Sequence, residues 1–98
     1  MESWDELAEV FKALSDGTRL QLVRLLGQHQ GTLCVNALAH KLGVTQSAVS
    51  QHLRVLRQAG LVRGERHGAR VHYSLQPDGL ERFRGALTQV LDGESADP

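Results

Sequence analysis

The chain has 98 residues and carries 11 acidic and 11 basic side chains, so its formal net charge at pH 7 is zero. This length supports one domain, because a second core usually requires well over ~200 residues. The single cysteine excludes an intrachain disulfide, no apolar run approaches the ~20 residues of a membrane span, and the acidic start is unlike a basic signal peptide. We therefore expect one cytoplasmic domain over residues 1–92, without a membrane partner.

Residues 3–59 have the apolar spacing of four helices. The first, about 3–15, begins with a capping-box pattern of Ser3 and Glu6. The second follows Asp16, its expected N-cap, and is apolar around more than half of its circumference, which predicts a central position. The third and fourth, about 35–42 and 46–59, are separated by a three-residue turn at Gly43. Gly60 is expected to end the fourth helix in the left-handed conformation.

After Gly60 the apolar period changes from that of a helix to two. This change predicts strands over about 61–66 and 69–75, joined by a turn at His67-Gly68. A last helix is expected over about 78–91, followed by a flexible polar tail, 93–98. The predicted fold class is mainly α with a small β-hairpin: four helices, two strands and a final helix.

Charge is concentrated in the middle of the chain. Residues 17–73 contain eight basic side chains and one acidic one, Glu65, whereas the flanking segments 1–16 and 74–98 have net charges of −4 and −3. A basic centre between acidic ends indicates a polyanionic partner for the centre, although an uneven solvated surface would give the same count.

Two short helices joined by a tight turn form a helix-turn-helix, here about 35–59. In its second helix the outward stripe carries hydroxyls, amides and a guanidinium but no carboxylate, and these groups hydrogen-bond base edges and phosphates in a major groove. An ordinary solvated helix face is the alternative. The candidate DNA-contacting residues of this helix are Gln46, Ser47, Ser50, Gln51, His52 and Arg54. For His52, partial packing behind the helix is the other interpretation.

The hairpin, about 61–75, has arginines at its tip, and a basic hairpin after a helix-turn-helix is the wing of a winged-helix domain. Arg66 and Arg70 are therefore candidate contacts to phosphate or the minor groove. The first and last helices, about 3–15 and 78–91, each carry more apolar surface than a monomer of this size readily covers, so we expect them to dimerise. The candidate interface residues are Trp4, Leu7, Phe11, Leu80, Phe83, Leu87 and Val90.

Residues 11–19, 33–35, 47–53 and 60–62, with the hairpin that follows, resemble the ArsR/SmtB family of winged-helix repressors. The resemblance spans about residues 7–76 and implies a homodimer that binds an operator in double-stranded DNA and is released by an inducer, often a metal ion. One departure is Gly17, where the family usually has proline at the first helical position.

Two further departures concern sensing. Metal-sensing members often have Cys-x-Cys at the start of the third helix, but here Cys34 is followed by Val35 and Asn36, and Ala39 replaces a further thiol. One thiolate cannot complete a soft-metal site. No histidine follows His72, so the family's last-helix metal site is also missing. We expect no metal site and no cofactor. Cys34 remains a candidate thiol sensor, with a small packed residue at a helix start as the alternative.

We interpret the chain as a dimeric transcription regulator, a repressor with an unidentified inducer, that binds an inverted-repeat operator. The alternative is a winged helix used for protein–protein contact without DNA. An enzyme is not expected, since no paired carboxylates, nucleophile–base pair or phosphate-binding loop are evident in the sequence.

Overall fold

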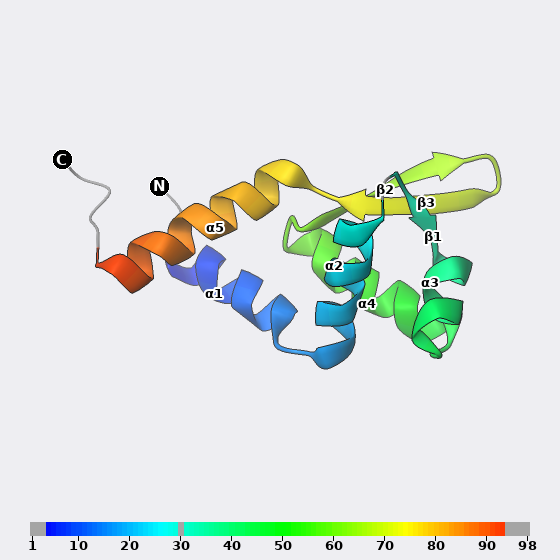
Figure 1. Cartoon of the computed structure of the whole chain (residues 1–98), viewed down its shortest axis with the longest axis horizontal. Coiled ribbons are helices and arrows are strands. Elements are labelled where there is room, and N and C mark those ends of the chain that lie inside the picture. Colours follow the sequence, from blue (N-terminus) through cyan, green and yellow to red (C-terminus); the bar gives the residue numbers. More distant parts are fainter. Residues whose placement is uncertain (1–3, 30, 94–98) are drawn as a thin grey trace.

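The computed structural model describes residues 4–29 and 31–93. Four helices precede the wing, with a short strand between the second and third: α1 (Trp4–Leu14), α2 (Gly17–Gln28), β1 (Leu33–Cys34), α3 (Val35–Leu42) and α4 (Gln46–Gln58). Two longer strands and a final helix complete the chain: β2 (Val62–His67), β3 (Arg70–Leu75) and α5 (Pro77–Asp92) (Figure 1). The predicted mainly helical class with a β-hairpin is confirmed.

The helix boundaries follow from local capping. The Asp16 carboxylate accepts a hydrogen bond from the backbone N–H of Arg19 at 3.0 Å, and the Thr45 hydroxyl accepts one from the N–H of Ala48 at 3.0 Å. Both bonds satisfy amide groups that the first helical turn leaves unpaired. Gly60 has φ 79°, so the predicted left-handed end of α4 is confirmed. Ser3, the expected cap of α1, lies outside the described residues.

The sheet differs from the prediction in two respects. It has three strands in the order β1-β3-β2, because Leu33 and Cys34 pair with Tyr73 and His72 of β3. The two-residue strand β1 was not predicted. The hairpin turn is Gly68-Ala69 rather than His67-Gly68, since His67 pairs directly with Arg70. Gly68 has φ 65°, and a positive φ at the first central position alone is the requirement of a type II′ turn.

The core lies between the three central helices and the base of the sheet. Its fully buried side chains come from α2, α3, α4 and the residue before β2: Leu22, Leu38, Val49, Leu53, Leu56 and Leu61. Val10 and Leu14 of α1 and Leu80 of α5 pack against this cluster and remain partly exposed. The prediction that α2 is central therefore holds.

The molecule is elongated, with extents of 48 × 24 × 21 Å. Figure 1 shows α1 and α5 side by side at one end and the hairpin turn of β2 and β3 at the other. The first turn of α5 lies directly on the end of α4: a Cβ atom at buried Gly79 would approach the Gly60 carbonyl oxygen to 1.8 Å. None of the described helices has the length and apolar character needed to cross a membrane. Apart from Gly93, the tail 93–98 lies outside the described residues.

Candidate nucleic-acid interface

The α3–α4 pair has the geometry of a helix-turn-helix. Gly43 adopts φ 67°, and its backbone N–H and that of Val44 donate to the carbonyls of His40 and Ala39 at the end of α3. The Gln46 side-chain amide also donates to the Asn36 carboxamide oxygen of α3 at 2.9 Å. Gln46, expected at the DNA, is therefore also a bridge between the two helices, which fixes the start of α4 against α3.

The fourth helix divides into a buried face and an exposed polar face. Val49, Leu53 and Leu56 are fully buried. The opposite stripe is exposed and contains no carboxylate; it consists of Ser47, Ser50, Gln51, Arg54 and Gln58. The predicted burial pattern is confirmed. Because the apolar face is fixed in the core, the polar stripe has one orientation relative to the rest of the molecule.

His52 differs from the other candidate residues of α4. It is half-buried, and its Nδ1 lies 3.2 Å from Nη1 of Arg19 on α2. This environment agrees with the interpretation that His52 packs beside the helix. A sequence pattern could not reveal the contact, because its two residues are 33 positions apart.

The wing presents its arginines on both faces of the hairpin. Arg66 pairs with Val71, whereas Arg70 pairs with His67, and directly opposed residues share a face while neighbours alternate. Arg66 and Arg70 therefore project from opposite faces beside the turn, and both are exposed. Arg63, which was not among the candidates, is exposed near the base of β2, where its Nε donates to the Ser74 hydroxyl at 3.4 Å.

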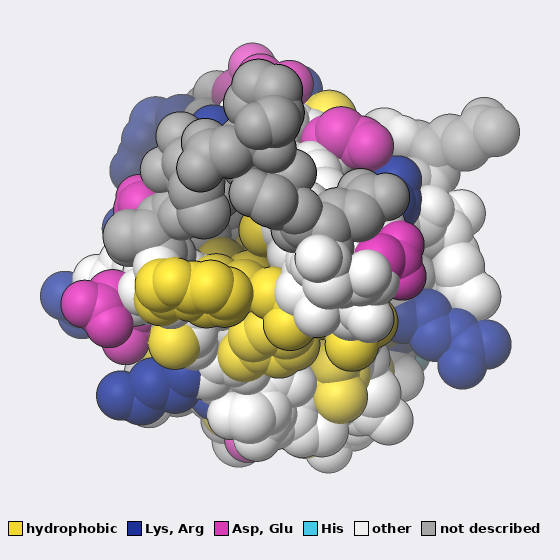
Figure 2. Space-filling model, turned by 90° about the vertical axis from the view of Figure 1, so that its left-hand side faces the viewer, with side chains coloured by type: hydrophobic (Ala, Val, Ile, Leu, Met, Phe, Trp, Pro, Cys, Tyr) yellow, Lys and Arg dark blue, Asp and Glu magenta, His cyan; other side chains and the backbone are white. Residues whose placement is uncertain are grey.

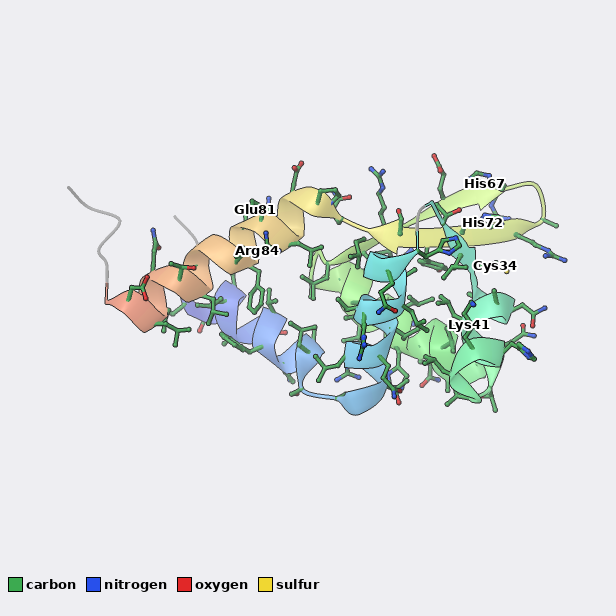
Figure 3. All side chains as sticks on the ribbon, viewed as in Figure 1. Cys34, Lys41, His67, His72, Glu81 and Arg84 are labelled. Atoms are coloured by element: carbon green, nitrogen blue, oxygen red, sulfur yellow. The ribbon has the colours of Figure 1, made fainter. Side chains whose placement is uncertain are left out.

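The one carboxylate of the basic segment is engaged within the wing. Glu65 Oε1 lies 3.1 Å from His67 Nε2, and the His67 ring stacks on that of His72 with centroids 4.6 Å apart. Figure 3 labels His67 and His72, and His72 Nδ1 in turn lies 3.1 Å from the Thr32 hydroxyl. This network joins the hairpin to the segment before β1, and it places Glu65 against a histidine beside the wing arginines.

Cys34 lies at the N-cap of α3, opposite His72 in the sheet. The backbone N–H of Ala37, with smaller contributions from the N–H of Asn36 and the Arg70 guanidinium, lowers the pKa of the Cys34 thiol. Within residues 4–29 and 31–93, no three histidine, cysteine or acidic side chains are grouped closely enough to hold a metal ion.

The expected dimerisation helices expose apolar side chains at the end of the molecule away from the wing. Trp4 is 71% exposed, and Phe11, Val90 and Leu91 are also exposed (Figure 2). Within the chain, Phe11 and Phe83 already meet edge to face, with centroids 5.2 Å apart. The other candidates are less accessible: Leu7 is buried in its own chain, and Leu80, Phe83 and Leu87 are partly buried.

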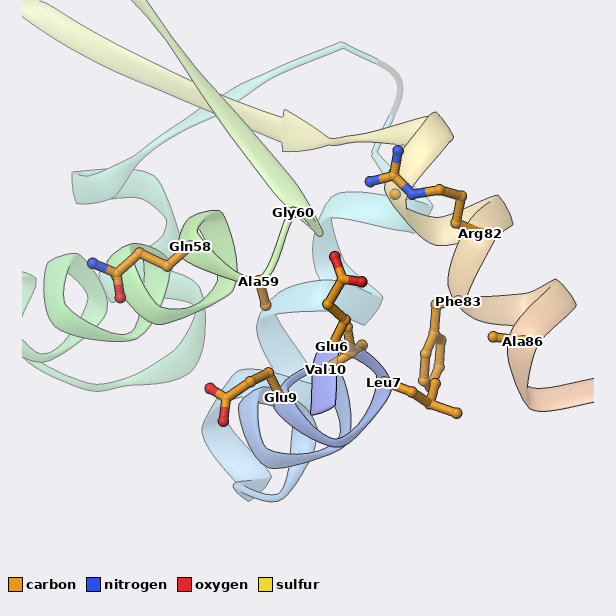
Figure 4. A pocket seen from close by; sticks show the side chains of 11 residues that line it. Glu6, Leu7, Glu9, Val10, Gln58, Ala59, Gly60, Arg82, Phe83 and Ala86 are labelled. Atoms are coloured by element: carbon orange, nitrogen blue, oxygen red, sulfur yellow. The ribbon is translucent and has the colours of Figure 1, made fainter. Parts of the chain in front are cut away.

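A cavity of about 340 Å³ lies where α1, the end of α4 and α5 meet. Figure 4 shows Glu6 of α1, Arg82 and Phe83 of α5 and the backbone at Gly60 around it. The cavity thus adjoins both the apolar end of the molecule and the residue that ends α4.

Comparisons with known proteins agree with this geometry. A model of the family described as "Bacterial regulatory protein, arsR family" matches residues 16–63, from the N-cap of α2 into β2. The chain is 40% identical over 97 residues to the HTH-type transcriptional regulator Rv2034 of Mycobacterium tuberculosis, covering 95% of this chain and 89% of that protein. It is 44% identical over 69 residues to the arsenical resistance operon repressor of Escherichia coli, covering 70% of this chain but 58% of that repressor.

A solved structure extends the likeness to the whole fold. The homodimeric winged helix-turn-helix DNA-binding domain of a Mycobacterium bovis protein, determined in solution, superimposes with a TM-score of 0.72 at 37% identity. The match covers 95% of this chain and 83% of that domain. It includes the helices at the apolar end as well as the helix-turn-helix and the wing.

Proposed function

The chain belongs to the ArsR family of transcriptional regulators, and we propose that it represses transcription by binding, as a homodimer, an inverted-repeat operator in double-stranded DNA. The observation that carries this proposal is the exposed stripe of α4. It is polar, free of carboxylates and fixed in orientation by a fully buried opposite face. Base edges and phosphates in a major groove are the groups that such a stripe recognises.

In this proposal α4 enters the major groove. Gln51 and Arg54 are the side chains with bidentate hydrogen-bonding capacity for base edges, and Ser47 and Ser50 add hydroxyls from the same stripe. Arg66 and Arg70 of the wing contact phosphates or the adjacent minor groove, adding affinity with little sequence reading. The acidic flanking segments stay away from the DNA because like charges repel.

The apolar end formed by α1 and α5 is the proposed dimer interface. Trp4, Phe11 and Val90 leave apolar surface exposed on a monomer, and a second copy is the partner we propose for it. In its support, the similar M. bovis domain is homodimeric. A two-fold axis through this interface relates two copies of α4, so each reads one half of an inverted repeat. We propose the cytoplasm, where the DNA of such an operator lies, as its compartment.

Selection from a random duplex library tests the function directly. The protein is incubated with the library, bound DNA is recovered and sequenced, and the mass of the complex is measured. We expect an inverted repeat with half-sites about one helical turn apart, bound by two copies, with affinity that falls steeply as salt rises. If no sequence is enriched and no salt-dependent duplex binding occurs, the proposal fails in favour of a winged helix used for protein contact.

A further inference from the structure

The junction between α1 and α2 contains an arginine of α2 whose guanidinium contacts two other elements, α1 and α4. The Arg19 guanidinium donates from Nε to the carbonyl of Ala13 and from Nη2 to the carbonyl of Lys12, at 3.4 Å for the second. Both carbonyls belong to the last turn of α1, which is negatively polarised, and that of Lys12 also accepts hydrogen bonds from the N–H and the hydroxyl of Ser15. Arg19 therefore holds the end of α1 against the start of α2.

The third contact of Arg19 reaches the helix that we propose enters the DNA. Its Nη1 lies 3.2 Å from Nδ1 of His52. Because a guanidinium is always protonated and can only donate, Nδ1 of His52 is the acceptor and the imidazole carries its proton on Nε2. His52 stands between exposed Gln51 and fully buried Leu53, at the boundary between the two faces of α4.

The backbone of this arginine is itself fixed. Its N–H donates to the Asp16 carboxylate that caps α2, and this hydrogen bond is the main reason that the pKa of Asp16 is lowered below its ordinary value. The guanidinium is therefore carried by a fixed backbone position, and the residue is half-buried.

We infer that Arg19 is a positioning residue for DNA recognition: through His52 it links α4 to α1 and adds to the buried face of α4 in setting the orientation between these two helices, without touching DNA. The inference rests on the proposed function, in which α1 lies at the dimer interface and α4 in the groove. Reading an inverted repeat requires both copies of α4 to be placed correctly with respect to the two-fold axis. Contacts to phosphate alone do not depend on that placement, so Arg19 contributes to specific binding and not to non-specific binding.

The test measures affinity for the selected operator and for an unrelated duplex, each over a range of salt concentrations. Arg19→Lys keeps the charge but loses the planar fork that reaches three acceptors. His52→Ala removes the acceptor, whereas His52→Asn keeps a side-chain oxygen that a guanidinium can donate to. Arg24→Lys, at an exposed position of the same helix, is the matched control.

We expect Arg19→Lys and His52→Ala each to weaken operator binding about tenfold, because each loses a hydrogen bond to a charged group. Non-specific affinity and both salt slopes should stay at wild-type values. The loss of operator affinity should be distinctly smaller for His52→Asn than for His52→Ala. Arg24→Lys should bind the operator as tightly as the wild type. The double variant Arg19→Lys/His52→Ala should be no weaker than either single variant, since both remove the same link.

Three results would overturn the inference. A lower salt slope in Arg19→Lys would mean that Arg19 contacts a phosphate, and equal losses for both duplexes would mean that the variants reduce the folded fraction. Losses that multiply in the double variant would mean that the two side chains act independently. Because all comparisons are made with an operator that the wild type binds, failure of the proposed function is seen separately, as absence of wild-type binding.

Discussion

The fold lowers the pKa of the Cys34 thiol, which lies at the start of α3. Free N–H groups of the first helical turn, that of Ala37 above all, stabilise a thiolate at this point, and the Arg70 guanidinium adds a smaller attraction. A lowered pKa increases the thiolate fraction near neutral pH. The thiolate is the reactive form, so Cys34 is expected to react with electrophiles and oxidants faster than an unperturbed cysteine.

The pH dependence of alkylation tests this expectation. The rate of reaction of Cys34 with iodoacetamide rises as the thiol loses its proton, so its midpoint should lie below the ordinary pKa of a cysteine thiol. Arg70→Gln removes the attraction to the guanidinium and should move the midpoint to higher pH, while Arg63→Gln, further along the hairpin, should leave it unchanged. A midpoint at or above that of free cysteine would contradict the lowered pKa.

For single residues, the sequence predicted the roles that depend on contacts between residues close together in the chain. Asp16, Gly60 and Thr45 cap or end helices through contacts within three to five residues, and the roles of Asp16 and Gly60 were predicted. The link between Arg19 and His52 joins residues far apart in the chain, and no local spacing marks it. Residue type alone placed His52 among the candidates without identifying its partner.

Among the elements, α4 allows the sharpest test, because its buried face leaves its exposed stripe one orientation. If Gln51 or Arg54 makes a bidentate contact to a base, its alanine variant should lose about 1–3 kcal/mol of discrimination at one base position. The measurement is a comparison of sequence preference from library selection for wild type and each variant. Unchanged preference in both variants would remove these two side chains from base readout.

The wing gives a different prediction, because phosphate contacts carry charge and little sequence information. Each arginine that neutralises a phosphate contributes roughly 1 to the slope of log affinity against log salt, so Arg70→Ala should reduce the slope by about 2 in a dimer. Arg84→Ala on α5, where the guanidinium is held by Glu81 at 3.1 Å, is the control and should keep the full slope. If Arg70→Ala leaves the salt slope unchanged, Arg70 does not contact a phosphate.

The same salt titration with Arg66→Ala compares the two faces of the hairpin. Since Arg66 and Arg70 project from opposite faces, a difference between their slopes identifies the face that the DNA backbone approaches. Any two-residue turn near this point places Arg66 and Arg70 on opposite faces, so the register of the hairpin changes their partners and not their faces. The prediction put the turn one residue too early, and it missed β1, whose two residues are too few to show a period.

Most acidic and most basic residues lie in different parts of the molecule, although the composition as a whole has no net charge. The acidic segments contain α1 and α5, which lie at one end (Figure 1), whereas the basic segment 17–73 carries its charges on α2, α3, α4 and the wing. Apolar periodicity was sufficient to predict the element types and the buried face of α4. It could not show which apolar residues of α1 and α5 are buried within the chain, because that depends on how the two helices pack: Leu7 is buried, whereas Trp4 stays exposed.

Introducing a charge into the apolar end tests the dimer. In the proposed interface Phe83→Asp would bury a carboxylate without a partner, so we expect a monomer that also binds the operator weakly. The measurements are mass in solution and operator affinity. Phe83 also contacts Phe11 in its own chain, and the variant could therefore lose stability; Val90→Asp, at an exposed position, provides the same test without that loss. A folded monomer with full operator affinity would disprove the dimeric mode of binding.

The contact between Gly79 and Gly60 has a mechanical consequence for any signal that reaches α5. The backbone of α5 at Gly79 touches the backbone of the turn that follows α4, and no side chain lies between them at this point. A shift of α5 at the proposed dimer interface is therefore expected to act directly on the turn that follows α4, and a shift of that turn in a DNA complex is expected to act on α5 through the same contact.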